Sequence, residues 1–451
     1  MSARPTKKNR INGGVKNMKL IKFSFIVAIA VMAIIGVSTT SYAFHAGGVA
    51  SCESCHTMHN SLASKGMIIG QTANAGDPTL SNKFLLKGSD QSSTCLNCHE
   101  ATDQSSYHVS APNATIIANA NTPINYGPGG DFSWLKSATT TTTVAINRRG
   151  HNIVAADFGY VADVDNLTAP GGGAGALAAA NLNCIACHNP HNQLRRTSDA
   201  NNNYVKPAIG TNVYGIAGSG SASNAPVATV TAPLGPYRFL RGAGADQAPL
   251  STNFAFTADP PAVMSPNTYN RSEATADTHV AYGSGMSAWC GNCHSGMNDS
   301  LGDIATGNSG HPHPVNKAIG ATMAALYNAY VGSGNLTNVT NGYSSLVPVE
   351  MDTVDYSAIK AAASSSNGGT YLTALATSKV MCLSCHRAHA TGFASMTRFN
   401  VAGNTTDSAG QYVLASGMTS TTQALAAYYQ QSPAKFGANT KQLCNKCHVK
   451  D

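Results

Sequence analysis

Apolar residues recur at helical spacing in only two segments of this 451-residue chain. The first, Lys317–Val331, has apolar side chains about one turn apart at Ala318, Ala321, Ala325 and Tyr330. The second, Thr422–Gln430, has a similar pattern. Residues that recur every three to four positions share one face of a helix. Both segments are therefore predicted to be helical.

The rest of the chain lacks this periodicity and is rich in residues that favour turns. Gly171–Gly173, Gly215–Ala225 and Pro260–Pro261 are predicted to be irregular connections. Thr140–Ile146 is the best candidate for a strand. The pattern predicts mostly irregular coil with short helices and little strand.

The first 43 residues have the features of a secretory signal peptide. Lys19 and Lys22 follow Met18, an apolar run extends from Phe23 to Val37, and the segment ends in Ser41-Tyr42-Ala43. A retained membrane anchor is the alternative, but the apolar run is shorter than the roughly 20 residues of a membrane span. We expect residues 1–43 to be removed, with Met18 as a possible true start, and residues 44–451 to form one unit.

The charge of the chain is concentrated in this leader. Residues 1–43 contain seven of the 28 basic residues and no acidic residue, which leaves 21 residues of each sign in the remainder. The basic balance is therefore no evidence for a nucleic acid or an anionic membrane as partner. Only 11% of all residues are charged and 7% are aromatic, so a core built from side chains alone would be thin.

All twelve cysteines of the chain lie in C-x-x-C-H motifs. In chain order, the first to sixth motifs are Cys52/Cys55/His56, Cys95/Cys98/His99, Cys184/Cys187/His188, Cys290/Cys293/His294, Cys382/Cys385/His386 and Cys444/Cys447/His448. C-x-x-C-H is the attachment signature of haem c. The two thiols lie about one helical turn apart and can add to the two vinyl groups of one porphyrin. The following His binds the iron as its proximal ligand.

Other uses of cysteine fit this pattern poorly. A disulfide framework would not place every pair at one spacing before a His. A tetrahedral zinc site does not call for His directly after the second Cys, and a thioredoxin-like motif would occur once. The sequence therefore predicts six haem c groups, around which residues 44–451 wrap as a continuous haem-cored chain.

Nine further histidines are available as second axial ligands, more than six irons need. Three of them, His59, His191 and His389, lie three residues after the proximal His of the first, third and fifth motifs. Each is too close in sequence to reach its own iron easily, so we expect it to bind a neighbouring haem. Their alternation suggests three haem pairs in sequence.

Three more distal ligands are predicted in loop-like segments, at His108, His151 and His311. His279 and His313 are predicted to be bystanders, and the role of His45 stays open. Methionine is the rival sixth ligand. Since histidines suffice, Met58, Met286, Met297 and Met381 are predicted to be packing residues.

The sequence closely resembles the OmcS-type hexahaem cytochromes of metal-reducing bacteria, which polymerise into extracellular filaments. The likeness spans nearly the whole chain after the leader, and the matching stretches are spread along it: FHAGGVASCESCHTMHNSL from Phe44, SSTCLNCH from Ser92, GHNIVAADFGYVAD from Gly150, TYNRSEAT from Thr268, VAYGSGMSAWCGNCH from Val280, CLSCHRAHATGFASMTRFN from Cys382 and the terminal LCNKCHVKD.

This resemblance implies six bis-His haems stacked in one continuous chain of parallel and perpendicular pairs. It implies that subunits join end to end, with an axial His donated across the boundary: the donor matches His59 and the receiving haem is that of the fifth motif. It also implies secretion through the periplasm to the outer cell surface. Expected partners are other copies of the chain, other redox proteins and insoluble acceptors such as Fe(III) oxides, with no nucleic acid and no membrane anchor.

Electron transfer is the predicted function, because the supply of His can close all six irons. Two alternatives stay open. One is a monomeric periplasmic electron shuttle. The other is a multihaem reductase, which would keep one iron open to substrate; with closed irons we predict no catalytic residue and no enzymatic activity.

Overall fold

A computed structural model describes residues 52–57, 61–62, 65–66, 85–101, 108–112, 127–136, 148–173, 175–188, 190, 197–198, 204–205, 240–242, 254–258, 261, 263–264, 280–298, 314–330, 343–354, 358–359, 362, 373–416, 418, 420–433 and 443–448. All of them fall within one compact unit, Ala43–Asp451. The predicted signal peptide and the predicted strand at 140–146 lie outside the described residues. Among these residues, no helix has the length and apolar character needed to cross a bilayer.

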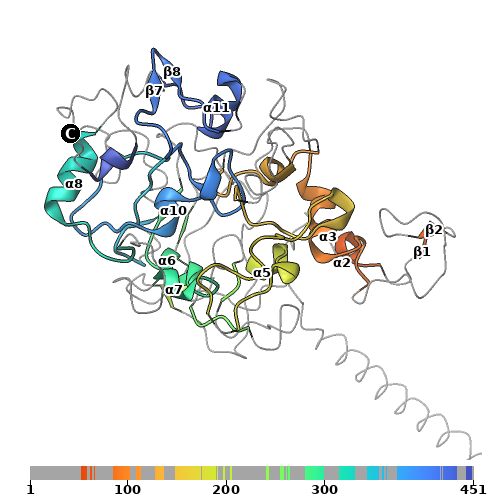
Figure 1. Ribbon diagram of the computed structural model, residues 1–451. Coiled ribbons are helices and arrows are strands. Elements are labelled where there is room, and N and C mark those ends of the chain that lie inside the picture. Colours follow the sequence, from red (N-terminus) through yellow and green to blue (C-terminus); the bar gives the residue numbers. More distant parts are fainter. Residues whose placement is uncertain are drawn as a thin grey trace, which may run out of the picture. The chain divides into compact units, whose positions relative to one another are not determined.

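Irregular coil makes up most of the described chain, as the sequence predicted (Figure 1). The α-helices are α2 (Cys52–Cys55), α3 (Gln91–His99), α5 (Cys184–Cys187), α6 (Met286–Cys290), α7 (Ser295–Asn298), α8 (Gly320–Ala329), α10 (Cys382–Cys385) and α11 (Thr421–Ala427). The 3-10 turns are η3 (Phe132–Lys136), η4 (Ala156–Phe158), η5 (Ala179–Asn181), η9 (Ala394–Met396) and η11 (Leu443–Lys446).

Strands are short and occur as antiparallel pairs of two residues each. They are β1 (Ser61–Leu62) with β2 (Lys65–Gly66), β3 (Thr197–Ser198) with β4 (Tyr204–Val205), β5 (Val263–Met264) with β6 (Ala281–Tyr282), and β7 (Asp407–Ser408) with β8 (Gln411–Tyr412). In β5–β6, Val263 is opposite Tyr282 and Met264 is opposite Ala281.

Both predicted amphipathic helices are present, and both are shorter than predicted. Helix α8 lies inside 317–331, and α11 covers most of 422–430. The α11 helix ends before Tyr429 and Gln430, because these two residues have positive φ angles of 57° and 62°. Left-handed backbone cannot continue a right-handed helix.

The largest buried apolar cluster is rich in aromatic side chains. The ring of Tyr412 stacks on that of Tyr428, with 3.8 Å between centroids, and Phe393 meets Tyr428 edge-on at 4.9 Å. Cys444 and Cys447 of the sixth motif pack against this cluster. The sixth motif therefore lies against an aromatic core.

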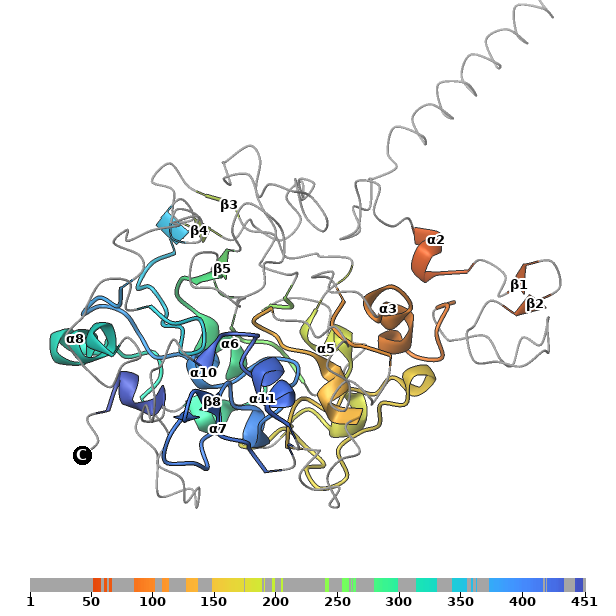
Figure 2. The ribbon, with the colours of Figure 1, turned by 90° about the horizontal axis from the view of Figure 1, so that it is seen from above.

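Helices that carry motifs lie side by side. Helix α3 contacts α5, and α6 contacts α10, as two views of the chain show (Figures 1 and 2). The elements that carry C-x-x-C-H motifs thus form much of the regular structure. The fold places the motifs next to one another, and the described parts of the connections are mostly irregular.

Candidate haem centres

Each C-x-x-C-H motif folds into about one helical turn. The backbone N–H of the motif His donates to the carbonyl of the first Cys in four motifs: His188 to Cys184 (2.9 Å), His294 to Cys290, His386 to Cys382 and His448 to Cys444 (3.0 Å each). The first and second motifs lie in α2 and α3. Residues three apart on a helix share one face, so both thiols of a motif can meet one porphyrin.

Local hydrogen bonds explain why these short turns form. Asp90 caps α3, where its carboxylate accepts from the Ser93 N–H at 2.7 Å. Asn183 caps α5, where its side-chain oxygen accepts from the Ala186 N–H at 3.0 Å. Side-chain acceptors of this kind satisfy the N–H groups left open at a helix start. Caps stabilise turns that would be too short to persist alone.

Cysteines of successive motifs approach one another. The side chains of Cys95 and Cys184 lie within hydrogen-bonding distance of each other. The side chains of Cys290 and Cys382 are in the same kind of contact. The second and third motifs therefore meet at their first cysteines, as do the fourth and fifth.

The remaining motifs join the same series through electrostatic contacts. Cys55 interacts with Cys95. Cys187 interacts with Cys293. Cys385 interacts with Cys444 and Cys447. The six motifs thus follow one another in space in the order in which they occur in the sequence.

Cys98 of the second motif differs from the other predicted thioether residues. It is exposed, whereas the described side chains of the other motif cysteines are half-buried. The reason is the orientation of α3, which buries Ser92, Ser93 and Leu96 and leaves the Cys98 thiol on the solvent side. Haem attachment at Cys98 stays a prediction.

His56 of the first motif is held by the same backbone pairing as His188 and His386. It follows the end of α2 and forms an isolated antiparallel bridge with Leu86, as His188 does with Leu240 and His386 with Thr397. The flanking bonds run from the Thr57 N–H to the Leu85 carbonyl (2.7 Å) and from the Lys87 N–H to the Cys55 carbonyl (2.9 Å). The backbone around His56 is thus paired with the segment that leads into α3. Iron binding by His56 stays a prediction.

Two buried serines hold the paired motifs together, and they were not identified from the sequence. The Cys184 N–H donates to the Ser92 hydroxyl at 3.0 Å, and the Cys382 N–H donates to the Ser287 hydroxyl at 3.2 Å. Each Ser lies three residues before the first Cys of its own motif, in Ser-Ser-Thr-Cys95 and Ser-Ala-Trp-Cys290. That shared position was the signal in the sequence. The same junction is therefore built twice.

Two pairs of imidazole rings lie at a separation that suits a shared iron, one pair tilted and the other edge-on. The rings of His188 and His389 have centroids 6.3 Å apart, and those of His294 and His151 are 6.1 Å apart. Each ligating nitrogen lies about 2 Å from the metal and about 1 Å from the centre of its own ring, so two axial imidazoles have centroids about 6 Å apart. Both pairs fit the two axial ligands of one haem iron.

Histidine tautomers also suit iron binding. The Nδ1–H group donates to a backbone carbonyl in His151 (Ala388, 2.6 Å), His294 (Pro170, 2.8 Å) and His386 (Ser395, 2.9 Å). This bond leaves Nε2 without a proton and oriented for a metal. Burial, and next the nearby His294, lowers the pKa of His151 to about 4, so this imidazole is neutral at pH 7.

The backbone of His389 is held by two segments, one that contains Gly129 and one that contains His151. Its N–H donates to the Gly129 carbonyl at 2.7 Å, and its carbonyl accepts from the His151 N–H at 2.9 Å. A Cβ atom on Gly129 would lie 2.6 Å from the His389 ring. The ring also stacks on Phe132, with 4.6 Å between centroids. Gly129 and Phe132 were not identified from the sequence, because only the tertiary fold brings them to His389.

The alternation of spare His residues suggested three haem pairs in sequence, and this pairing stays a prediction. The ring of His389, which follows the fifth motif, lies 6.3 Å from the ring of His188 in the third motif. Contacts between cysteine side chains join motifs two to three and four to five. His389 therefore lies beside the proximal His of a motif that is not next to its own in the sequence.

Other predicted ligands are placed less directly. His108 is buried, and its neighbour Val109 donates its N–H to the His99 carbonyl at 2.8 Å, so this segment runs beside the second motif. The remaining predicted distal ligands, His59, His191 and His311, lie outside the described residues, as do His45, His279 and His313. Their roles stay predictions.

Two of the methionines near the motifs are packing residues, as predicted: Met286 and Met381 are buried in an apolar cluster with Leu383. Met297 is 49% exposed, and its packing against a porphyrin stays a prediction. Met58 lies outside the described residues.

Comparisons with known proteins give one consistent result. No protein-family model matches the chain. The C-type cytochrome OmcS of Geobacter sulfurreducens is 43% identical over 445 residues, which cover 94% of this chain and 98% of that protein. Two solved structures of that organism are similar over 90% of this chain and all of theirs. They are the outer membrane cytochrome S filament (TM-score 0.74, 43% identity) and the OmcS nanowires (TM-score 0.73, 41% identity). The similarity thus extends far beyond the haem motifs.

Proposed function

Because this chain belongs to the OmcS family of c-type cytochromes, we propose that it forms extracellular filaments and conducts electrons through six covalently bound haems. The observation that carries the proposal is the spatial order of the six motifs, in which a cysteine of each motif interacts with a cysteine of the next. A conductor needs such an unbroken series. It needs no substrate pocket.

The described residues fit haem c. Haem c supplies a one-electron Fe(III)/Fe(II) couple when it is bound. The twelve cysteines would form its thioether bonds, and the six motif histidines would bind iron on one side. On the other side, His389 would serve the third motif and His151 the fourth, because their rings lie 6.3 Å and 6.1 Å from the proximal rings.

Ligation by two imidazoles favours conduction over catalysis. An iron with both axial positions filled has no place for a substrate, and it changes little in geometry when it gains or loses an electron. The Nδ1–H bonds of His151 and His294 to backbone carbonyls hold these rings in orientation. The chain therefore acts as an electron carrier and has no catalytic residue.

Filament formation is supported by the two similar structures, a filament and nanowires of OmcS. A head-to-tail interface that does not close on itself generates an open filament. In this proposal, His59 of one subunit is the second ligand of the fifth-motif haem of the next. Insoluble acceptors outside the cell, such as Fe(III) oxides, and other redox proteins would exchange electrons with the filament.

Electron microscopy and spectroscopy test this function together. Purified protein should form unbranched fibres, and mass spectrometry should count six haems per chain. Electron paramagnetic resonance of the oxidised protein should show only low-spin ferric iron. Monodisperse monomers at high concentration would instead indicate a soluble shuttle. A stoichiometric high-spin signal would indicate an open iron and a reductase.

A further inference from the structure

A buried carboxyl group lies where the fourth and fifth motifs meet. Glu350 is 1% exposed. Its backbone pairs with Lys379, through N–H to carbonyl bonds of 2.9 Å and 2.8 Å in the two directions. The next residue, Met351, donates its N–H to the Tyr282 carbonyl of β6 at 2.7 Å. Glu350 is thus fixed between β6 and the segment that leads into α10.

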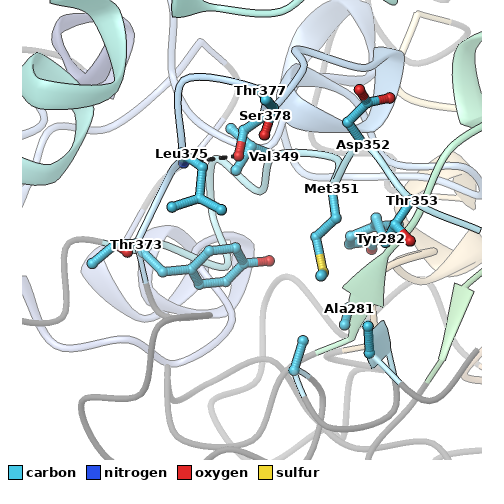
Figure 3. A pocket seen from close by; sticks show the side chains of 13 residues that line it. Ala281, Tyr282, Val349, Met351, Asp352, Thr353, Thr373, Leu375, Thr377 and Ser378 are labelled. Carbon is cyan, nitrogen blue, oxygen red and sulfur yellow. Dashed lines mark hydrogen bonds between the residues drawn. The ribbon is translucent and has the colours of Figure 1, made fainter. Parts of the chain in front are cut away.

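The side chain of Glu350 faces α6, not the neighbouring cavity. A cavity of about 200 Å³ is lined by Val349 and Met351, the residues on either side of Glu350, but not by Glu350 itself (Figure 3). Alternate residues of an extended segment point to opposite faces. The carboxylate instead accepts the N–H groups of Gly285 (3.3 Å) and Met286 (3.2 Å) at the start of α6.

This position is next to two haem attachment points. Helix α6 ends at Cys290, whose side chain lies within hydrogen-bonding distance of Cys382 at the start of α10. The charge of Glu350 also acts on Cys382 directly. A charge at this junction therefore acts on the haems of both motifs.

Few charged groups surround this carboxyl group. Lys379 and Asp352 act on it, and they pair with each other, with Nζ 2.6 Å from Oδ1. Asp352 is 49% exposed, and the buried Tyr282 faces the segment from β6. Burial raises the pKa of Glu350 to about 7, whereas the two N–H bonds and Lys379 act in the opposite direction. The group therefore changes protonation close to neutral pH.

We propose that Glu350 is a proton-coupling residue, which takes up a proton when an electron reaches the haem of the fourth or fifth motif and releases it when the electron leaves. The inference rests on the proposed function, since it requires haems at both motifs. In this step ferric iron would gain one electron, and the carboxylate would take up one proton from solvent. The electron comes from the neighbouring haem or from an electrode.

The physical reason is electrostatic. Reduction removes one positive charge from the iron centre, and the low dielectric of a buried site weakens the screening of that change. The carboxylate is then less stable and binds a proton more tightly. The potential of the coupled haem must therefore fall as pH rises, by at most about 59 mV for each tenfold fall in proton concentration with one electron and one proton.

Spectroelectrochemistry of the intact filament tests the proposal between about pH 6 and about pH 8. Wild-type protein should contain a haem component whose potential falls with pH. Glu350→Gln keeps the size and one acceptor oxygen but cannot titrate, so this dependence should be lost. Glu350→Asp should restore part of it. Asp165→Asn, which removes an exposed carboxylate that is not among the groups acting on Glu350, should keep the wild-type slope.

Infrared difference spectra between oxidised and reduced protein give a second measurement. A protonated carboxyl C=O band should appear on reduction in wild-type protein and be missing in Glu350→Gln. Equal slopes and equal bands in the two proteins would overturn the inference. If Glu350→Gln fails to fold, wild-type potentials that do not change with pH would overturn it equally. Fewer than six haems by mass spectrometry would count against the proposed function, whereas six haems with equal slopes would count against Glu350 alone.

Discussion

The imidazole ring of His389 lies edge-on to that of His188, with 6.3 Å between ring centroids. His389 follows the fifth motif and His188 belongs to the third. The ring of His151 lies 6.1 Å from that of His294 in the fourth motif. The backbone N–H of His151 donates to the backbone carbonyl of His389 at 2.9 Å. One short contact between two backbone segments therefore positions ligands for two candidate irons.

Replacement of His389 by Ala should open one iron. We expect all six haems to remain attached, because the cysteines are unchanged, and one haem per chain to become high-spin. Electron paramagnetic resonance of the ferric protein measures this directly. His279→Ala serves as the control and should stay fully low-spin. An entirely low-spin spectrum of His389→Ala would remove His389 as an axial ligand.

Gly129→Ala should have a related effect without the loss of any His. The new Cβ atom would lie 2.6 Å from the His389 ring, which Phe132 confines on one face. The ring must move, so part of the third-motif haem should become high-spin and the protein should unfold at a lower temperature. Gly403→Ala is a matched control, because its Cβ atom would be no closer than 3.4 Å to its neighbours. Identical spectra of the two variants would contradict the predicted crowding.

His59→Ala should impair filament assembly more than haem attachment. Its side chain is proposed to complete a haem of the neighbouring subunit, whereas attachment depends on the cysteines. Fibre yield by electron microscopy should fall strongly while mass spectrometry still counts six haems. Wild-type fibre yield would exclude His59 as the bridging ligand.

Tyr327→Phe should destabilise the aromatic core. The Tyr327 hydroxyl donates to the Val347 carbonyl at 2.6 Å and accepts from the Ser344 N–H at 3.1 Å. Its removal leaves two backbone groups without this partner, which costs about 1–3 kcal/mol per unsatisfied buried group. Thermal unfolding followed by circular dichroism measures the change. Val164→Ala at an exposed position should leave the unfolding temperature nearly unchanged.

The stability of the folded protein should fall as pH rises towards and through neutrality, partly because of Glu350. Burial raises its pKa from 4.5 to about 7. Between these values the unfolded chain has lost this proton and the folded chain still holds it, so folding takes up a proton and weakens as pH rises. The unfolding temperature of Glu350→Gln should therefore fall less between about pH 5 and about pH 8. An equal fall in both proteins would show that Glu350 does not contribute.

Local structure was predictable wherever a short pattern suffices. Residues 317–331 contain α8, and the C-x-x-C-H motifs fold into helical turns, because spacing within one or two turns is a local property. The end of α11 was less predictable, since Tyr429 and Gln430 adopt left-handed backbone within a packed core. Ser92 and Ser287 each lie three residues before the first Cys of a motif, and this shared position can be seen in the sequence. Their role became clear only from the structure, in which they accept the N–H groups of Cys184 and Cys382.

The predicted chemistry of this protein follows from its amino-acid order alone: twelve cysteines in six C-x-x-C-H motifs predict thioether attachment, and the spare histidines predict a second axial ligand. The order of residues leaves open which imidazole faces which, and how far each motif is enclosed. The tertiary fold decides these positions, because it brings His389 to His188, His151 to His294, and the Glu350 carboxylate to the start of α6. The reason is that a covalent motif acts within five residues, whereas axial ligation and electrostatic coupling depend on contacts between segments far apart in the chain.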